Sequence, residues 1–183
     1  MRKLLSFLLI LGILAWSPSW LRAETQSVAG LLAKAKKAYL AKDYQRAMKW
    51  YKKAADHGNA DAECRIGGMF EDGEGVAKDY RKAMEWYQKA AAQGDATAEY
   101  FIGTMYDQGD GLAKDDQLAF TWFEKAAEQG NVYAETSIGT LYDSGAGVAP
   151  DSQKAMEWYQ KAVDQGYGPA QKYLDDLENR TGS

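Results

Sequence analysis

Residues 62–94, AECRIGGMFEDGEGVAKDYRKAMEWYQKAAAQG, decide the fold, because closely similar stretches follow at a spacing of 36 residues. The repeat is easiest to see in its tryptophans, since Trp50, Trp86, Trp122 and Trp158 stand one period apart. A fixed period of roughly 20 to 50 residues is typical of a solenoid, in which each unit stacks on its neighbours because it cannot bury its apolar face alone. The sequence therefore predicts an array of repeats and favours a binding function over catalysis.

Each repeat contains two segments in which apolar or small residues recur at helical spacing. Residues 96–106 place one such set on a single helical face, and residues 79–91 place a second set on another. The two sets are Ala98, Ile102, Met105 and Tyr106, and Ala83, Trp86, Tyr87, Ala90 and Ala91. Because the Trp column recurs at one structural position, we expect its side chains to be core residues.

Capping residues and glycines mark the ends of these helices. An aspartate stands where each second helix begins (Asp79, Asp115, Asp151), and its carboxylate can accept hydrogen bonds from the free amides of the first turn. The loop inside each unit carries Gly-x-Gly, as in residues 72–76. A phosphate-binding loop is the alternative, but this motif follows a helix, lacks a third glycine and recurs in every unit. We therefore assign it a structural role.

These residues resemble the Sel1-like repeat, a relative of the tetratricopeptide repeat with a longer, glycine-rich internal loop. Between Ala62 and Gly94 the chain carries Ala-x-x-x-Ile-Gly, then Gly-x-Gly, then Ala-x-x-Trp-Tyr-x-Lys-Ala-Ala. The resemblance implies a scaffold for protein contacts, which in exported bacterial members often means envelope regulation, envelope assembly or dealings with a host. Some cysteine-rich relatives are described as β-lactamases or penicillin binders, but their paired cysteines are missing here.

The predicted fold is all-α, a right-handed α-solenoid of about nine helices stacked as antiparallel pairs. Its ends differ from its middle, as capping units do. The predicted segments are a signal peptide at 1–23, a tetratricopeptide-like N-terminal capping unit at 24–59, Sel1-like repeats at 60–95, 96–131 and 132–167, and a C-terminal capping helix and tail at 168–183.

The N-terminus has the layout of a secretory signal peptide. Arg2 and Lys3 precede an apolar run at 4–16, which is shorter than the roughly 18 residues that a membrane-spanning helix needs. Pro18 then breaks the run, and Ala23 offers a small residue for cleavage. We predict cleavage near Ala23, no membrane insertion of the mature chain, and a periplasmic or secreted location. An uncleaved N-terminal anchor is the alternative.

Charge and composition narrow the classes of function. Loss of the three positive charges in residues 1–23 takes the formal net charge from −4 to −7, so we expect neither nucleic acid nor an anionic membrane surface as partner. Cys64 is the only cysteine and His57 the only histidine, which excludes an intrachain disulfide and a paired-histidine metal site. We predict no cofactor, no metal site and no enzymatic activity.

Comparison of the repeats with one another indicates a candidate binding face. Positions that are the same in every unit serve stacking, whereas the varying positions of the first helices share a separate face. First helices of related solenoids line the concave side, so we expect a protein or peptide to bind there. The candidate residues are Arg65, Tyr100, Phe101, Thr104, Tyr133, Thr136, Lys172 and Tyr173. The alternative for the aromatic members is that they only fill space between units.

The predicted function is that of a monomeric, non-catalytic scaffold that mediates protein contacts in the bacterial envelope. Two alternatives stay open. One is a secreted factor that binds a host protein, and the other is a β-lactam or peptidoglycan-fragment binder with weak hydrolase activity.

Overall fold

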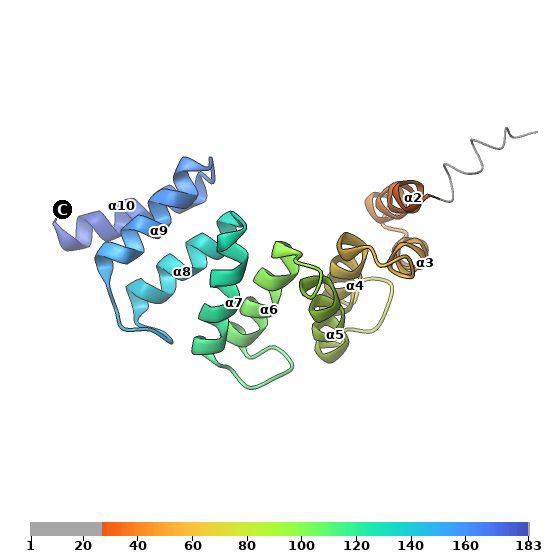
Figure 1. Ribbon diagram of the computed structural model, residues 1–183, viewed down its shortest axis with the longest axis horizontal. Helices are drawn as coiled ribbons and strands as arrows, with labels where there is room; N and C mark the ends of the chain where they lie inside the picture. Colours follow the sequence, from red (N-terminus) through yellow and green to blue (C-terminus); the bar gives the residue numbers. More distant parts are fainter. Residues whose placement is uncertain (1–26, 183) are drawn as a thin grey trace, which may run out of the picture.

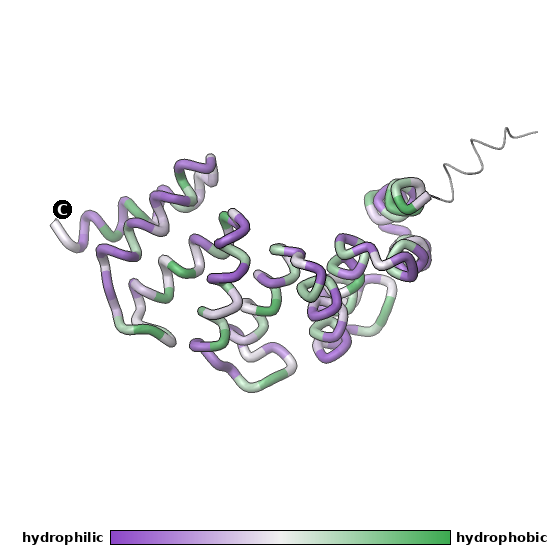
Figure 2. The backbone as a smooth tube through the Cα atoms, viewed as in Figure 1, coloured by the Kyte–Doolittle hydropathy of each residue, from purple (hydrophilic) through white to green (hydrophobic). Residues whose placement is uncertain are grey.

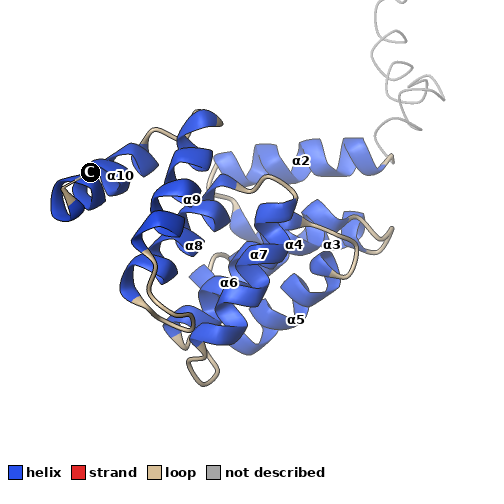
Figure 3. Cartoon of the chain, turned by 60° about the vertical axis from the view of Figure 1, so that its left-hand side comes forward, coloured by secondary structure: helices blue, strands red, loops and turns tan. Residues whose placement is uncertain are grey.

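The computed structural model describes residues 27–182, so the predicted signal segment lies outside the described residues. Within this range the chain forms nine α-helices and no strand, which confirms the predicted all-α solenoid (Figure 3). The helices are α2 (Val28–Leu40), α3 (Tyr44–Ala55), α4 (Ala60–Asp72), α5 (Tyr80–Ala91), α6 (Ala96–Gln108), α7 (Asp116–Glu128), α8 (Val132–Ser144), α9 (Ser152–Asp164) and α10 (Pro169–Thr181).

The helices follow one another along a curved path from α2 at one end to α10 at the other (Figure 1). Each helix packs mainly against the helix before it and the helix after it. The closest association is within the pairs α2–α3, α4–α5, α6–α7 and α8–α9, while α10 packs on α9. Stability in such an array comes from contacts inside each unit and between adjacent units.

Side-chain caps begin the helices where the sequence places them. The Asp79 carboxylate accepts from the Lys82 backbone amide at 3.1 Å, and Asp115 and Asp151 do the same for α7 and α9. Asn59, Asp95 and Asn131 cap the first helices α4, α6 and α8 in the same way. The aspartate caps of the second helices are therefore as the sequence predicts, and the caps of the first helices are an addition from the structure.

The second glycine of each Gly-x-Gly loop lies against the preceding unit. Gly75 has φ 71°, and a Cβ there would lie 2.7 Å from the backbone carbonyl carbon of Tyr44 at the start of α3. Gly111 and Gly147 approach α5 and α7 as closely. Glycine is required at this position for two reasons. The backbone is left-handed there, and the loop of one unit touches the start of the second helix of the unit before it.

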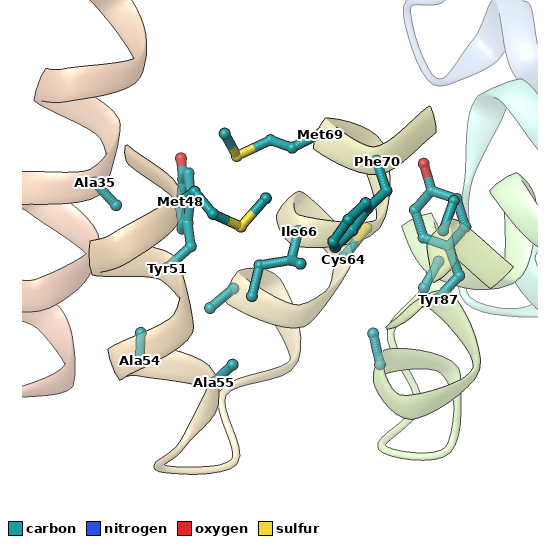
Figure 4. Packing of buried hydrophobic residues seen from close by; sticks show 14 of the residues in the cluster. Ala35, Met48, Tyr51, Ala54, Ala55, Cys64, Ile66, Met69, Phe70 and Tyr87 are labelled. Atoms are coloured by element: carbon teal, nitrogen blue, oxygen red, sulfur yellow. The ribbon is translucent and has the colours of Figure 1, made fainter. Parts of the chain in front are cut away.

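The core runs along the array as buried side chains between successive helices, and the tube in Figure 2 alternates apolar and polar stretches along each helix. Figure 4 shows Met48 of α3 extending toward α4, the helix of Ile66, with Tyr87 of α5 on the other side. The alanine that precedes each tryptophan by three residues is fully buried in all four units (Ala47, Ala83, Ala119, Ala155). These small side chains let the paired helices approach closely.

The prediction that the Trp column forms the core is wrong. Trp50, Trp86, Trp122 and Trp158 are only half-buried at the edge of the core. The buried ring in each unit is the next residue, such as Tyr87 at 0% exposure or Phe123 at 2%. Each tryptophan instead presents a ring face to the lysine three residues later, with Lys89 Nζ 4.0 Å from the centroid of Trp86. This cation–π contact recurs in every unit.

Candidate functional site

The candidate residues lie on four successive first helices. Arg65 is on α4, and the others are on α6, α8 and α10. Two of them are large and well exposed, since Tyr133 retains 51% and Tyr173 47% of its accessible surface. Among the described residues only Leu40 and Leu118 are also large, apolar and exposed to this extent. The candidate face therefore holds half of the exposed large apolar side chains.

A continuous row of aromatic rings runs along this face, and we call Phe101, Tyr100, Tyr133 and Tyr167 the aromatic row. The ring centroid of Tyr100 lies 5.4 Å from that of Phe101 and 5.7 Å from that of Tyr133. Tyr133 in turn meets Tyr167 edge-on at 5.0 Å. These distances are typical of favourable aromatic pairs, so the row links α6, α8 and the turn before α10.

Tyr167 is a member of the row that the sequence reasoning missed. It occupies the position at which Asn59, Asp95 and Asn131 cap the first helices of the preceding units. The N-cap position of α10 is instead taken by Gly168, so this helix has no side-chain cap. The three preceding repeats have a capping residue at this position. Its replacement by tyrosine was the sequence signal that could have identified Tyr167.

Phe101 and Tyr173 also take part in packing between units. The Phe101 ring stacks on buried Tyr87 of α5, and the Tyr173 ring stacks on buried Tyr159 of α9. Each ring therefore has one face on the core and some surface in solvent. Such a residue can pack between units and still contact a partner.

The polar candidates differ in how available they are to a partner. The Thr136 hydroxyl donates to the Val132 carbonyl at 2.9 Å, and the residue is buried. Thr104 donates to the Tyr100 carbonyl at 3.1 Å and is half-buried. Lys172 is exposed on α10. Arg65 is exposed on α4, where its Nε lies 3.4 Å from an Asp61 carboxylate oxygen. The accessible part of the face is therefore aromatic at its middle and charged at its two ends.

A cavity of about 240 Å³ opens at the α4 end of the face, between Arg65 and Phe101. Cys64 lines it, yet this thiol is 6% exposed, and burial raises its pKa to about 12. A thiol so protonated is a poor nucleophile at neutral pH. The cavity is therefore a recess at one end of the candidate face, and the thiol that lines it is unreactive.

Three buried glutamates hold the ends of the repeats together. Glu63, Glu99 and Glu135 are at most 8% exposed, and each accepts a hydrogen bond from a glutamine 30 residues later. The Gln93 side-chain amide donates to Glu63 at 2.5 Å. Gln93 follows α5 of the same unit as Glu63. The contact therefore closes each helix pair on itself.

In the part of the chain that the structure describes, no three His, Cys, Asp or Glu side chains lie together as metal ligands. Nor does any helix within residues 27–182 have the length and apolar character needed to cross a membrane.

A family model described as Sel1 repeat matches residues 37–59, 60–95, 96–131 and 132–167. The chain belongs to the Sel1 repeat family. Proteins of this family are mostly non-catalytic scaffolds for protein interaction. The four matched segments contain helices α3 to α9 with their loops, and α10 follows the last of them.

Solved structures show the same fold. A Sel1 repeat protein from Oxalobacter formigenes is 33% identical, with a TM-score of 0.79, over 87% of this chain and 67% of its own. A protective antigen of uropathogenic Escherichia coli strains, which displays an SLR fold, is 32% identical with a TM-score of 0.77. That match covers 87% of this chain but 35% of the antigen.

Helicobacter pylori cysteine rich protein B is similar in fold, with 24% identity and a TM-score of 0.55 over 69% of this chain and 96% of its own. A comparison with curated protein sequences gave no match.

Proposed function

We propose that this Sel1 repeat protein binds another protein through the face of its first helices, with the aromatic row as the centre of contact. The observation that carries the proposal is Tyr133, which is half-exposed while its ring meets Tyr100 on one side and Tyr167 on the other. Such a ring is already ordered, so binding costs little side-chain entropy. Ordered, partly exposed tyrosines are typical of residues that dominate binding energy.

The composition around the row supports the same role. The varying positions of α6 and α8 carry only aromatic or hydroxyl side chains: Thr97, Tyr100, Phe101, Thr104, Tyr133, Thr136, Ser137 and Thr140. The centres of protein interfaces are depleted in charge and rich in aromatic residues, with charged residues at the rim. Arg65 and Lys172 stand at the two ends of this uncharged stretch, where we assign them to the rim.

We assign the protein to the bacterial envelope, as a non-catalytic monomer exported by its N-terminal segment. The basic head and short apolar run of residues 2–16 support export. The similarity to a protective antigen of uropathogenic Escherichia coli supports the second candidate, a secreted factor that engages a host protein.

Site-specific photo-crosslinking in the native host tests the binding face. A photo-reactive phenylalanine analogue replaces Tyr133, and the matched control carries it in place of Leu118, which is 42% exposed on α7. We expect an adduct with another protein from position 133 and none from position 118. Adducts from both positions, or from position 118 alone, would refute this face as the binding site.

Binding measurements with the captured partner then test the row itself. Tyr133→Ala should weaken the partner's affinity by at least about tenfold, since it removes a central aromatic anchor. Leu118→Ala should leave the affinity unchanged. Circular dichroism of both variants should show unchanged helix content. Fractionation of periplasm, membrane and medium separates the envelope role from the secreted one.

A further inference from the structure

The positive charges of this chain gather at its N-terminal end, a feature that its negative net charge conceals. Residues 27–59 contain eight Lys and Arg against two Asp, a net charge of +6. Residues 60–182 contain 11 Lys and Arg against 23 Asp and Glu, a net charge of −12. The α2–α3 unit therefore has its own electrostatic character, opposite to that of the repeats that follow.

A cavity of about 320 Å³ opens between α2 and α3 in this basic unit, and we call it the basic groove. This volume falls at the lower end of the roughly 300–1,000 Å³ typical of ligand sites. The residues that line it are Lys34, Lys37, Ala38, Ala41, Asp43, Arg46 and Trp50. Alanine and tryptophan supply its apolar part, and three cations supply its charge.

Two of the cations that line the groove, Lys37 and Arg46, are available to a ligand. Asp43 is its one acidic residue, and this carboxylate already accepts from the Arg46 backbone amide as the cap of α3. The ion pairs found between residues 27 and 182 include neither Lys37 nor Arg46, both of which are exposed. These two side chains can therefore turn to a negatively charged group without breaking an existing ion pair.

Trp50 gives the groove an ordered apolar surface. Its ring is half-buried, and Lys34 Nζ and Lys53 Nζ lie 4.8 Å and 4.7 Å from the ring centroid. Ala38 beside it is buried at 6% exposure. An aliphatic side chain that entered the groove would contact the tryptophan and alanine, while a neighbouring carboxylate would meet the cations at the edge.

We propose that the basic groove binds a segment of a partner protein in which acidic residues alternate with aliphatic ones. The carboxylates pair with Lys37 and Arg46, and an aliphatic side chain packs on Trp50. Charge complementarity carries the choice of an acidic partner. A bilayer is flat on this scale and cannot enter a groove between two packed helices, so the structure favours a peptide over an anionic membrane. This site is separate from the aromatic row and does not depend on it.

Fluorescence anisotropy with three labelled peptides tests the chemistry of the groove. The probe contains four Glu-Leu-Ser repeats, and the comparison peptides contain four Lys-Leu-Ser or four Glu-Ser-Ser repeats. We expect the Glu-Leu-Ser peptide to bind at least about tenfold more tightly than either, and its affinity to fall as NaCl rises from about 50 to 200 mM. Binding of the Lys-Leu-Ser peptide with equal affinity would overturn the proposal.

Variants in the same helical unit separate the groove from general charge. Lys37→Glu with Arg46→Glu should reduce the affinity for the Glu-Leu-Ser peptide at least about tenfold. The matched control, Lys49→Glu with Lys52→Glu, makes the same change in net charge on exposed residues of α3 outside the groove. It should retain most of the affinity. Trp50→Leu should reduce the preference for Glu-Leu-Ser over Glu-Ser-Ser.

The same variants distinguish a peptide site from a lipid site. Sedimentation with vesicles of phosphatidylcholine containing about 30% phosphatidylglycerol measures binding to an anionic membrane. Equal loss of peptide affinity in the groove variant and its control would overturn the proposal. So would vesicle binding that depends on Lys37 and Arg46 without any binding of the Glu-Leu-Ser peptide.

Discussion

Phe101 stacks on Tyr87 with ring centroids 5.0 Å apart and planes inclined by 16°. Two repeats later Tyr173 makes the same contact with Tyr159, at 5.5 Å and 20°. In both cases the buried ring lies on the second helix of one unit, and the outer ring lies on the first helix that follows it. The residues that join the units are therefore also the residues that reach the proposed binding face, so stability and recognition share side chains at this face.

The buried ring of each second helix needs a glycine opposite it. A Cβ at Gly67 would lie 2.6 Å from ring carbons of Tyr87, whereas a Cβ at the adjacent Gly68 would approach only the Tyr87 hydroxyl, at 3.6 Å. We expect Gly67→Ala to lower the free energy of unfolding by about 1–3 kcal/mol through overpacking. Gly68→Ala should be neutral or stabilising by up to about 1 kcal/mol, because alanine favours a helix. Urea denaturation measures the free energy of unfolding of both variants. Equal changes would show that the Tyr87 ring does not restrict the side chain at position 67.

The correction to the Trp column changes which aromatic residue holds the fold together. Phe123 is 2% exposed, whereas the adjacent Trp122 is half-buried beneath Lys125. Phe123→Ala should cost about 3–5 kcal/mol of unfolding free energy, as a buried aromatic does. Trp122→Ala should cost at least about 1 kcal/mol less, because a smaller fraction of its side chain is buried and its removal leaves no enclosed cavity. A larger loss of melting temperature for Trp122→Ala than for Phe123→Ala would contradict this assignment.

Glu71 gives the protein a predictable dependence on pH. Burial raises its pKa above the ordinary value of 4.5, although the hydrogen bond that the Tyr87 hydroxyl donates to it acts in the opposite direction. An acid with a raised pKa in the folded state stabilises the fold below its unfolded pKa, and this contribution is lost as pH rises through the folded pKa.

We therefore expect Glu71→Gln to raise the melting temperature at pH 7, and this gain should shrink toward pH 4. The glutamine oxygen can still accept from Tyr87. Glu85→Gln, at an exposed position of α5, is the control and should change the melting temperature little at either pH. A Glu71→Gln variant that is less stable than the parent at pH 7 would show that the hydrogen bond outweighs the burial of charge.

The Cys64 thiol should react only slowly with thiol reagents in the folded protein. With a pKa of about 12, only roughly one thiol in ten thousand is ionised at pH 8, and the side chain is 6% exposed. We expect its reaction with a disulfide reagent such as 5,5′-dithiobis(2-nitrobenzoate) to be at least about a hundredfold slower in the native state than in urea. Cys64→Ser gives the background. Rapid native reaction would mean that the cavity beside Arg65 opens in solution.

The repeat period, the caps and the glycine loops could be predicted from the sequence because each is a local property. Asp79 caps α5 through residues three positions away, and Gly73 ends α4 through its own backbone. A 36-residue period also requires neighbouring units to stack alike, so the all-α solenoid followed from this period together with the helical spacing of apolar residues within each unit. The candidate residues on the first helices were likewise chosen from differences between repeats, and their role in binding stays a prediction.

Only the tertiary structure decided which aromatic residue of each Trp-Tyr pair is buried. Trp86 and Tyr87 are both aromatic and adjacent, but the space opposite Tyr87 is left free by Gly67, a residue of another helix. The same holds for the aromatic row, which joins Tyr133 to Tyr167 across a turn, and for the basic groove between α2 and α3. The sequence by itself determined the helices and their order, because these depend on nearby residues. Burial and grooves depend on packing between helices, and the tertiary structure alone decided them.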